Sequence, residues 1–516
     1  MTDDPLLAVE PAAALGVLKD FQTRFLYPFV FERRRVAAAS AALRAELWPG
    51  RDAKPHDLWE CAEPHHLYRD ELLDHVVGFL FTSAEVSGCG YLKIDDAAAN
   101  AWFAQTEVQL HSGIRLPVRL VPGVRMEVFL SPQGVGVLSV ALTPEQRGLP
   151  LDEAVAFNYQ LAQFRRRLAA KIRKRHPKDD LKVWERIPPA EQGRIPAAPE
   201  DDAPLLRRLG APGGSFTLDE LIGHLLEPLQ KHGLRSTQSE LSVYTVARLG
   251  RGADFGDPAV RTRLAAYLSA LAQVEEPGHA GMAPERLGVA DAVLNRRHWA
   301  AVGLLGAAHL AADQGDVAFD DQKMPIIRDK YFMPFLVALL QRVALNRGIE
   351  EAGQILARPP REAPQALIGL REDLLRFAVE GHFTQVSSRQ ALHRFYQLAR
   401  EGLDIPSAWE EVRRAIADLD AQFAAQRQTL LTRDMARNLG VVARVQTMVE
   451  WIEVFIVSVY FAHLWHMLTH ANGSVERLFP RSHDWVVHGG VVVCALLGGL
   501  ITFLLVKPWK HVDEPD

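Results

Sequence analysis

The sequence predicts an α+β N-terminal domain, a mostly α-helical region, a long stalk helix and a C-terminal two-helix transmembrane hairpin. Three observations predict this order: β-rich runs in the first third, apolar residues at helical spacing in the rest, and two long apolar stretches near the end. The expected divisions are a cytosolic α+β domain at 1–175, a proline-rich linker at 176–215, a helical cytosolic domain at 216–406, a stalk helix at 407–447 and the hairpin at 448–510.

The clearest strands of the first domain are expected at 124–130 and 135–142. They flank Ser131-Pro132-Gln133-Gly134, and a short connection that contains proline and glycine between β-rich runs is typical of a β-hairpin. A helix is expected at 151–175, because apolar residues there repeat at helical spacing.

The helical half is expected to begin after the proline-rich linker. Thr217 and Glu220 have the spacing of a capping box, and Asp257-Pro258 is typical of an N-cap followed by a proline in the first helical position. Further apolar or amphipathic runs of this half lie at 260–274, 290–312, 326–345 and 365–377.

The stalk helix is the clearest expectation in the soluble part. Ser407 and Glu410 predict a capping box. Apolar residues then follow at alternating steps of three and four, as in a coiled coil: Trp409, Val412, Ile416, Leu419 and Phe423. Because no proline interrupts 408–479, we expect one helix to continue from the cytosol into the bilayer, with a cytosolic part of about 60 Å at about 1.5 Å per residue.

The stretches 448–468 and 486–506 are each about long enough to cross a hydrocarbon core of ~30 Å as a helix. Only 469–485 separates them, so we expect an antiparallel pair with a short outer loop. Basic residues are more frequent beside the spans (Arg433, Arg437, Arg444, Lys507 and Lys510) than in the loop (Arg477 and Arg481). This bias predicts a bacterial-type inner (plasma) membrane protein with both termini cytoplasmic.

Within the second span, Gly490, Cys494 and Gly498 recur every four residues. Such a row of small residues lets a neighbouring helix approach the backbone closely. We therefore expect helix packing on this face, either within the hairpin or between subunits.

The composition agrees with a cytosolic body. Hydrophobic residues make up 48% of the 516 residues and charged residues 23%, and only the last 70 or so look suited to lipid. The net charge of −5 gives no indication of nucleic acid. We expect no signal peptide, because 1–5 shows neither a basic nor a long apolar region. With only Cys61, Cys89 and Cys494, we expect reducing cytosol and no disulfide framework.

Polar residues on the first span are the main functional candidates. The candidate ion-path or metal residues are Glu450, Glu453, His463, His466, His470 and, in the outer loop, Asn472. His463, His466 and His470 share one helix face, and imidazoles at this spacing can ligate a transition metal or relay protons. The alternative is interfacial placement beside Trp451 and Trp465. His463 separates these interpretations, because it lies deepest and is costly against lipid.

A second cluster of potential ligands lies in the soluble part, at Cys61, His65, His66, Asp70, Glu71, Asp74 and His75. Its spacing matches no recognised metal motif, so a solvated helix face is the preferred interpretation. The sequence also contains no phosphate-binding loop, no His-Glu-x-x-His and no Gly-x-Ser-x-Gly motif. We therefore predict that the protein is not an enzyme.

The order of segments, which ends in the short basic tail Lys507-Pro508-Trp509-Lys510, resembles the CorA-like divalent cation channels. The resemblance implies an oligomer whose first C-terminal membrane helix lines a pore. That family places Gly-Met-Asn after its first span, and the corresponding stretch here reads His470-Ala471-Asn472-Gly473, so only Asn472 can be matched. The longer cytosolic part leaves room for an added ligand-sensing domain.

The leading hypothesis is a homo-oligomeric divalent-cation channel or transporter in the lipid bilayer, gated by a ligand of its cytosolic part. Glu450 and Glu453 would concentrate cations at the inner mouth, and the three histidines would bind or gate further out. The one cofactor in this hypothesis is a divalent metal ion. The alternative is a membrane-anchored cytosolic sensor or scaffold without transport activity. A third hypothesis, an enzyme with an unfamiliar site near His65, His66 and Asp70, stays open.

Overall fold

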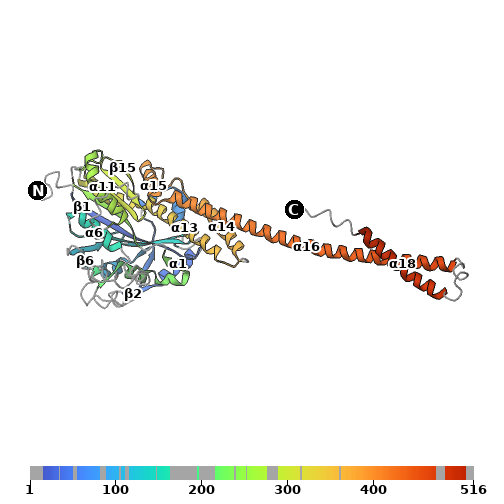
Figure 1. Cartoon of the computed structure of the whole chain (residues 1–516). Helices are drawn as coiled ribbons and strands as arrows, with labels where there is room; N and C mark the ends of the chain where they lie inside the picture. The colour runs from blue at the N-terminus through green and yellow to red at the C-terminus, as the bar shows by residue number, and fades with distance from the viewer. Residues whose placement is uncertain are drawn as a thin grey trace, which may run out of the picture. The chain divides into compact units, whose positions relative to one another are not determined.

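The computed structural model describes residues 16–33, 35–49, 55–64, 66–81, 89–103, 106–110, 115–146, 148–162, 195–196, 215–236, 240–250, 253–275, 289–313, 317–359, 362–471 and 483–506. The chain divides into two compact units, Met1–Leu419 and Asp420–Asp516. The first unit contains all of the described strands (Figure 1).

A sheet of 13 strands forms the centre of the first unit, and its main path runs β15-β16-β17-β14-β1-β9-β8-β5-β4. These strands are β1 (Val17–Val30), β4 (Trp59–Cys61), β5 (Tyr91–Ile94), β8 (Met126–Ser131), β9 (Val135–Pro144), β14 (Ser242–Leu249), β15 (Ala290–Asn295), β16 (His298–Gly303) and β17 (Gly306–Ala312). The β14–β17 pair is parallel, whereas β1 pairs antiparallel with both of its main neighbours.

Shorter strands extend the margins of this sheet: β6 (Thr106–Gln109), β7 (Arg115–Leu120), β10 (Leu149–Pro150) and β13 (Arg235–Ser236). Two separate two-stranded sheets are formed by β2 (Leu47–Pro49) with β3 (Pro55–Asp57), and by β11 (Ile195–Pro196) with β12 (Ser215–Phe216).

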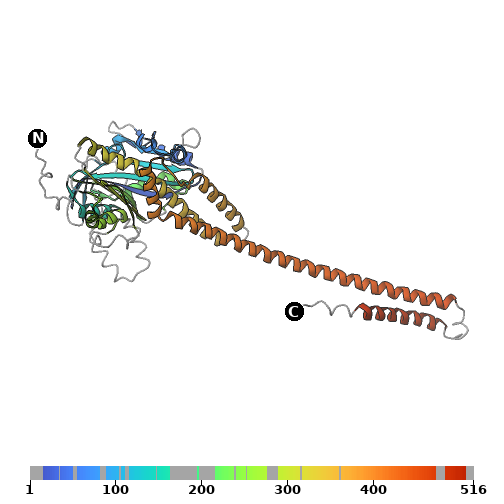
Figure 2. The same ribbon diagram turned by 90° about the horizontal axis from the view of Figure 1, so that it is seen from above.

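Helices cover both faces of the sheet (Figures 1 and 2). One face is covered by α1 (Val36–Arg44), α6 (Leu151–Ala162), α10 (Leu218–Leu225), η5 (Glu227–His232) and α11 (Pro258–Gln273). The other face is covered by α2 (His66–Arg69), α3 (Asp74–Leu80), α12 (Val317–Lys330), α13 (Phe332–Leu356) and α15 (Gln390–Gly402). A further short helix, α5 (Asp96–Trp102), follows β5.

Strand β1 shows why both faces are covered. Successive side chains of a strand point to opposite faces, and here both sets are buried. Phe21 meets the Phe157 ring of α6 edge-on at a centroid distance of 5.7 Å, whereas the Arg24 guanidinium lies 4.1 Å from the Phe332 ring centroid on α13. The central strand therefore needs a second layer of helices on each side.

Several local expectations are confirmed. The β8–β9 hairpin has the predicted connection, with Gly134 at a φ of +71°, a value that glycine adopts readily. The capping box of Thr217 and Glu220 is present at α10, and Asp257 caps α11 ahead of Pro258. Of the helix predicted at 151–175, α6 covers Leu151–Ala162, and the remainder lies outside the described residues.

The capping box predicted at Ser407 is wrong. Helix α16 (Ile405–Ala471) begins directly after Asp404, whose φ of +53° sets the start of the helix. Ser407 therefore lies inside the first turn. The apolar residues that follow do pack as predicted, because Val412, Ile416 and Leu419 are buried.

The expected helical character of 290–312 is also wrong, because this segment forms β15, β16 and β17. β16 and β17 are buried along their whole length, and strands buried on both faces read as continuous apolar runs, so periodicity did not distinguish them from a buried helix. These strands join β14 and β1 in one sheet, so the predicted separation of 1–175 from 216–406 is incorrect. The coarser order is confirmed: the sheet comes first, and every described segment from Val317 to Ala471 that has regular structure is helical.

The helical region ends in α14 (Ala363–Glu380), α15 and the 67-residue helix α16. Among the described residues, one helix is long and apolar enough to cross a membrane; it spans 405–469, has a window of mean hydropathy 1.4, and none of that window is buried. The last helix, α18 (His483–Val506), contributes a shorter apolar stretch, His488–Thr502.

Candidate functional site

The structure places the predicted ion-path residues along α16. Glu453, His463 and His466 are exposed and Glu450 is half-buried. His470 lies in the last turn of α16 without a described side chain, and Asn472 lies outside the described residues. Glu453 and His463 are separated by about 15 Å along the helix axis. Within the described part of one chain, no group of three or more His, Cys, Asp or Glu side chains is arranged to hold a metal ion.

Helix α18 lies alongside α16 (Figures 1 and 2), and the two helices approach each other closely at glycines of α18. A Cβ atom at Gly490 would overlap the Trp465 indole, and one at Gly498 would lie 3.1 Å from Cγ of Phe461. At Gly499 it would lie 3.0 Å from Oγ of Ser458. The predicted close approach at this row of small residues is therefore confirmed.

The face of α16 that contacts α18 is opposite to His463. Ser458, Phe461 and Trp465 step by three and four residues and so form one face. His463 is two positions from both Phe461 and Trp465, which is about 200° around the helix. The side chain of His463 is therefore directed away from α18, and within one chain it remains exposed.

A longer apolar seam lies on this exposed face, and the sequence interpretation missed it. Six β-branched residues alternate at steps of three and four: Val442, Val445, Val449, Ile452, Ile456 and Val459. The next two positions of the same pattern are His463 and His466. We call these eight residues the α16 seam. Its members are exposed on the single chain, for example Val442 at 59% and Val459 at 51%.

The seam was detectable in the sequence. An alternation of three and four residues is the coiled-coil repeat, and β-branched residues are common at its core positions. Among the sequence predictions, the same stepping is assigned only to 409–423.

The histidines do not form a polar stripe with both glutamates. They continue an apolar seam, and Glu453 lies about 80° from His463 around the helix, compared with about 140° for Glu450.

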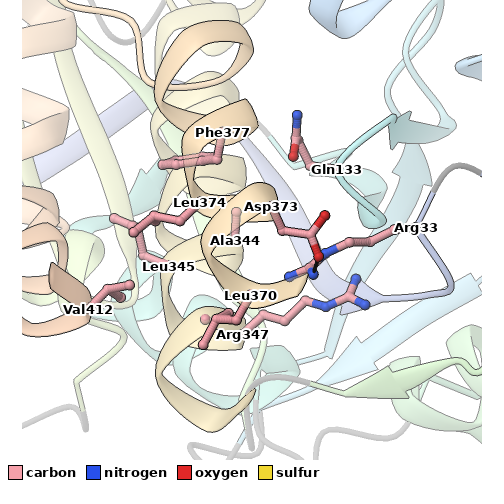
Figure 3. A pocket seen from close by; sticks show the side chains of 11 residues that line it. Arg33, Gln133, Ala344, Leu345, Arg347, Leu370, Asp373, Leu374, Phe377 and Val412 are labelled. Atoms are coloured by element: carbon pink, nitrogen blue, oxygen red, sulfur yellow. Dashed lines mark hydrogen bonds and ion pairs between the residues drawn. The ribbon is translucent and has the colours of Figure 1, made fainter. Parts of the chain in front are cut away.

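The first unit contains a small cavity between Arg33, Gln133, α13, α14 and the start of α16 (Figure 3). Its volume is about 20 Å³, which is room for about one water molecule. Arg33 donates a 2.8 Å hydrogen bond to Glu351 and also pairs with Asp373. Arg347 donates to the carbonyl oxygens of Phe31 and Gly134, both at 2.9 Å. The charges at this cavity are paired internally, which indicates a structural role.

A groove of about 390 Å³ lies next to this cavity and shares Gln133 with it. This volume is in the range of small-molecule sites, about 300–1,000 Å³. The Phe383 ring contacts the His75 and Phe79 rings at centroid distances of 5.2 and 5.3 Å. Gln133 Nε2 donates to the Glu380 carboxylate at 3.4 Å. An aromatic wall beside one carboxylate suits a small organic cation.

The groove is close to the start of α16. His382, the neighbour of Phe383, stacks on the Trp409 ring with a centroid distance of 4.8 Å and an interplanar angle of 10°. Burial, together with the Arg400 guanidinium, lowers the pKa of His382, so the imidazole stays neutral against the indole. Phe383 at the groove is therefore linked to Trp409 in the first turns of α16 through its chain neighbour His382.

The predicted Cys/His/Asp cluster forms no metal site among the described residues. His65 lies outside them, and His66, Asp70, Asp74 and His75 are exposed. Glu71 instead accepts hydrogen bonds from Lys330 and Arg389, both at 2.7 Å, and these lower the pKa of its carboxyl group. The described members of the cluster do not share one helix face, because Cys61 lies in β4, His66 in α2, and Asp74 and His75 in α3.

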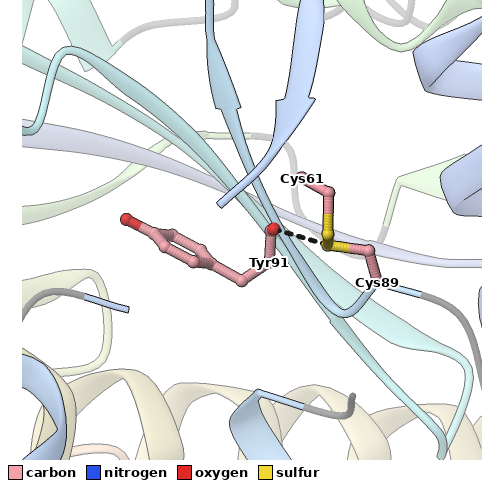
Figure 4. The surroundings of a disulfide bond; sticks show 3 residues. All are labelled: Cys61, Cys89 and Tyr91. Carbon is pink, nitrogen blue, oxygen red and sulfur yellow. Dashed lines mark hydrogen bonds between the residues drawn. A yellow bond between two sulfur atoms is a disulfide. The ribbon is translucent and has the colours of Figure 1, made fainter. Parts of the chain in front are cut away.

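Cys61 and Cys89 form a disulfide bond, so the expectation of no disulfide is wrong (Figure 4). Pairing of β4 with β5 brings the two segments together, with a Cα–Cα distance of 6.0 Å. Nothing in the sequence indicates that Cys61 and Cys89, which are 28 residues apart, form a bond. Such bonds are typical of oxidising compartments, and in the cytosol they are usually redox-sensing or catalytic. Cysteine usage therefore no longer supports a cytosolic body.

Replacement of both Cys61 and Cys89 by serine is expected to lower the free energy of unfolding by about 3–4 kcal/mol, because the bond closes a loop across 28 residues. Thermal unfolding with and without dithiothreitol measures this. The reductant should destabilise the native chain and leave the stability of the double variant unchanged. The matched control, Cys494→Ser, should respond to the reductant like the native chain. Two free thiols at Cys61 and Cys89 in the purified protein, detected by mass spectrometry, would contradict the prediction.

A charged cluster among the described residues of the first unit is buried. Arg24 pairs with Glu127 at 2.6 Å and with Asp329 at 2.9 Å, and all three side chains are at most 3% exposed. Arg24 also donates to the Tyr68 hydroxyl at 2.8 Å, and Tyr91 donates to Glu127. Burial raises the pKa of Tyr68 well above its usual value. No residue of this cluster lines the cavity or the groove, which indicates a structural network.

Comparison of the chain with known protein families, curated proteins and solved structures finds no match.

Proposed function

We propose that this chain is a homo-oligomeric inner-membrane protein of CorA-like architecture that conducts divalent cations. In this proposal, 448–468 of α16 forms the first span and 486–506, within α18, forms the second. The copies assemble around the α16 seam, so that the first spans line the ion path. The single observation that carries the proposal is that the seam, with its histidines, lies on the face of α16 opposite to α18.

The position of α18 supports this arrangement. If α18 covers the Ser458, Phe461 and Trp465 face, it occupies the outside of a ring of copies and the seam occupies the inside. A solitary hairpin would expose His463 to hydrocarbon, which is costly for a polar side chain. In the ring, His463 faces protein and the path.

The proposed ion path has two polar levels. Glu453 lies near the inner end of the first span and concentrates cations there. His463 and His466 form the outer level, and the sequence places His470 and Asn472 beyond them. We assign Glu450 a smaller role in the ion path, because it is half-buried and lies further around the helix from the seam.

The body is assigned to the cytoplasm on the strength of the basic residues beside the spans. In a cytoplasmic body, the Cys61–Cys89 disulfide would be a redox-responsive bond, because stable disulfides are rare in the cytosol. The groove lined by Phe79 and Phe383 is the proposed site for the gating ligand, since its rim contacts Trp409 of α16 through His382.

Divalent-cation flux into proteoliposomes tests the proposal. Replacement of Glu453 by glutamine or of His463 by alanine is expected to lower the flux by about tenfold or more, because each removes an ion-facing group. His488→Ala is the matched control, because His488 is an exposed histidine on α18. Absence of flux with the native chain under every ionic condition would remove the channel proposal.

The second candidate is a membrane-anchored sensor or scaffold without transport activity. The groove in the body favours it, because a ligand site requires no ion path. Exchange of 448–510 for an unrelated two-span anchor separates the two candidates. Cellular activity should persist for a sensor and be lost for a channel.

A further inference from the structure

The α16 seam has the geometry of a parallel association between identical helices. Its eight positions keep the alternation of three and four residues without interruption from Val442 to His466. In a parallel, in-register bundle every copy places the same residue at the same height. β-branched residues at both core positions favour bundles of more than two strands. The occupant of this exposed face is therefore a set of further copies of this chain.

The histidines then become two stacked layers. His463 and His466 are three residues apart, so their layers are separated by about 4.5 Å along the axis. Each layer contains one imidazole from every copy, and all of them point towards the same axis. Three or more imidazoles that converge on one point form the ligand set that borderline transition-metal ions prefer.

We propose that the His463 and His466 layers bind a divalent transition-metal ion of the zinc, cobalt or nickel class between the copies. This inference rests on the homo-oligomer of the proposed function, but it does not require transport. Mg²⁺ and Ca²⁺ prefer oxygen ligands, so the histidine layers select against them. Glu453 lies about 15 Å away along the axis and contributes no ligand to this site.

Cobalt(II) is the probe of the metal site, because its visible absorption reports nitrogen ligation directly. The full chain, reconstituted in lipid nanodiscs, is expected to bind Co²⁺ saturably at less than one ion per chain, since several copies share each site. Zn²⁺ should displace it, and a hundredfold excess of Mg²⁺ should not. His463→Ala and His466→Ala are each expected to weaken binding at least about tenfold, whereas His488→Ala should bind like the native chain.

Crosslinking tests the geometry separately. In a Cys494→Ala background, Val459→Cys on the seam is expected to form interchain disulfides on mild oxidation, and Ser458→Cys, on the face that contacts α18, is not. Equal crosslinking at both positions would overturn the seam assembly. Co²⁺ binding that is unchanged in the His463→Ala and His466→Ala chains would overturn the metal site.

The outcomes also separate this inference from channel activity. Histidine-dependent Co²⁺ binding without flux would support the metal site and remove the channel proposal. Flux without histidine-dependent binding would support the channel and overturn the metal site.

Discussion

Replacement of Arg24 by methionine is expected to lower the free energy of unfolding by about 3–5 kcal/mol, because it leaves buried carboxylates without their partner. Arg24 is 2% exposed and pairs with both Glu127 and Asp329. Arg328 also hydrogen-bonds Asp329, so Glu127 is the group most affected. Urea unfolding of the full chain in detergent, followed by tryptophan fluorescence, measures the change.

An exposed ion pair provides the matched control. Arg413 pairs with Glu410 at 2.9 Å, but its side chain is 58% exposed. Because water already solvates this pair, Arg413→Met should cost less than about 1 kcal/mol. Similar losses for Arg24→Met and Arg413→Met would contradict a structural role for the buried network. If Arg24→Met does not fold, Arg24→Met combined with Glu127→Leu should restore a folded chain, because removal of both partners avoids the unpaired charge.

Acidification is expected to destabilise the body below about pH 6.5 through a buried histidine pair. His298 Nε2 and His309 Nδ1 are 2.9 Å apart, and both residues are buried. Burial, with a contribution from Lys323, lowers the pKa of His298 to about 3. Burial and the neighbouring His298 lower the pKa of His309 well below its usual value.

The sign of this effect follows from proton binding. Below the unfolded pKa of about 6.5, the unfolded chain takes up protons at these imidazoles and the native chain does not. Stability is therefore complete above pH 6.5 and falls as the pH decreases towards 3. Each histidine contributes at most about 1.4 kcal/mol per pH unit, so the pair removes at most about 4 kcal/mol between pH 6.5 and pH 5.

Thermal unfolding at pH 7.5, 6.5, 5.5 and 5.0 measures the slope. A chain with His298→Gln and His309→Gln should lose most of the pH dependence even if it is less stable at pH 7.5. His66→Gln, which changes an exposed histidine, should keep the native slope. An unchanged slope in the double variant would show that other groups dominate acid unfolding.

The features that the sequence predicted correctly are local. The caps at Thr217 and Asp257 depend on hydrogen bonds across two or three residues, and the β8–β9 hairpin depends on a turn that ends in Gly134. The continuity of α16 followed from the absence of proline. Patterns of this kind need no knowledge of the rest of the fold.

The features that could not be predicted connect distant segments. The Thr23–Thr245 contact in the centre of the sheet joins residues 222 positions apart, and the Arg24–Asp329 pair joins residues 305 positions apart. The groove requires α3, the β8–β9 turn and the end of α14 to meet. Of the candidate site, the helix and its histidines were predicted. The seam was recognisable from its spacing, and the position of α18 on the opposite face required the structure.

The central place of β1 has a consequence for biosynthesis. This strand is synthesised before β9 and β14, yet it pairs with β9 on one side and β14 on the other. One of its edges must remain open until Ser242–Leu249 has been synthesised, and such an edge invites pairing with other chains. The last strand of the sheet ends at Ala312, well before the apolar part of α16 begins near Met448. The nascent chain can therefore complete its sheet before this apolar segment is made.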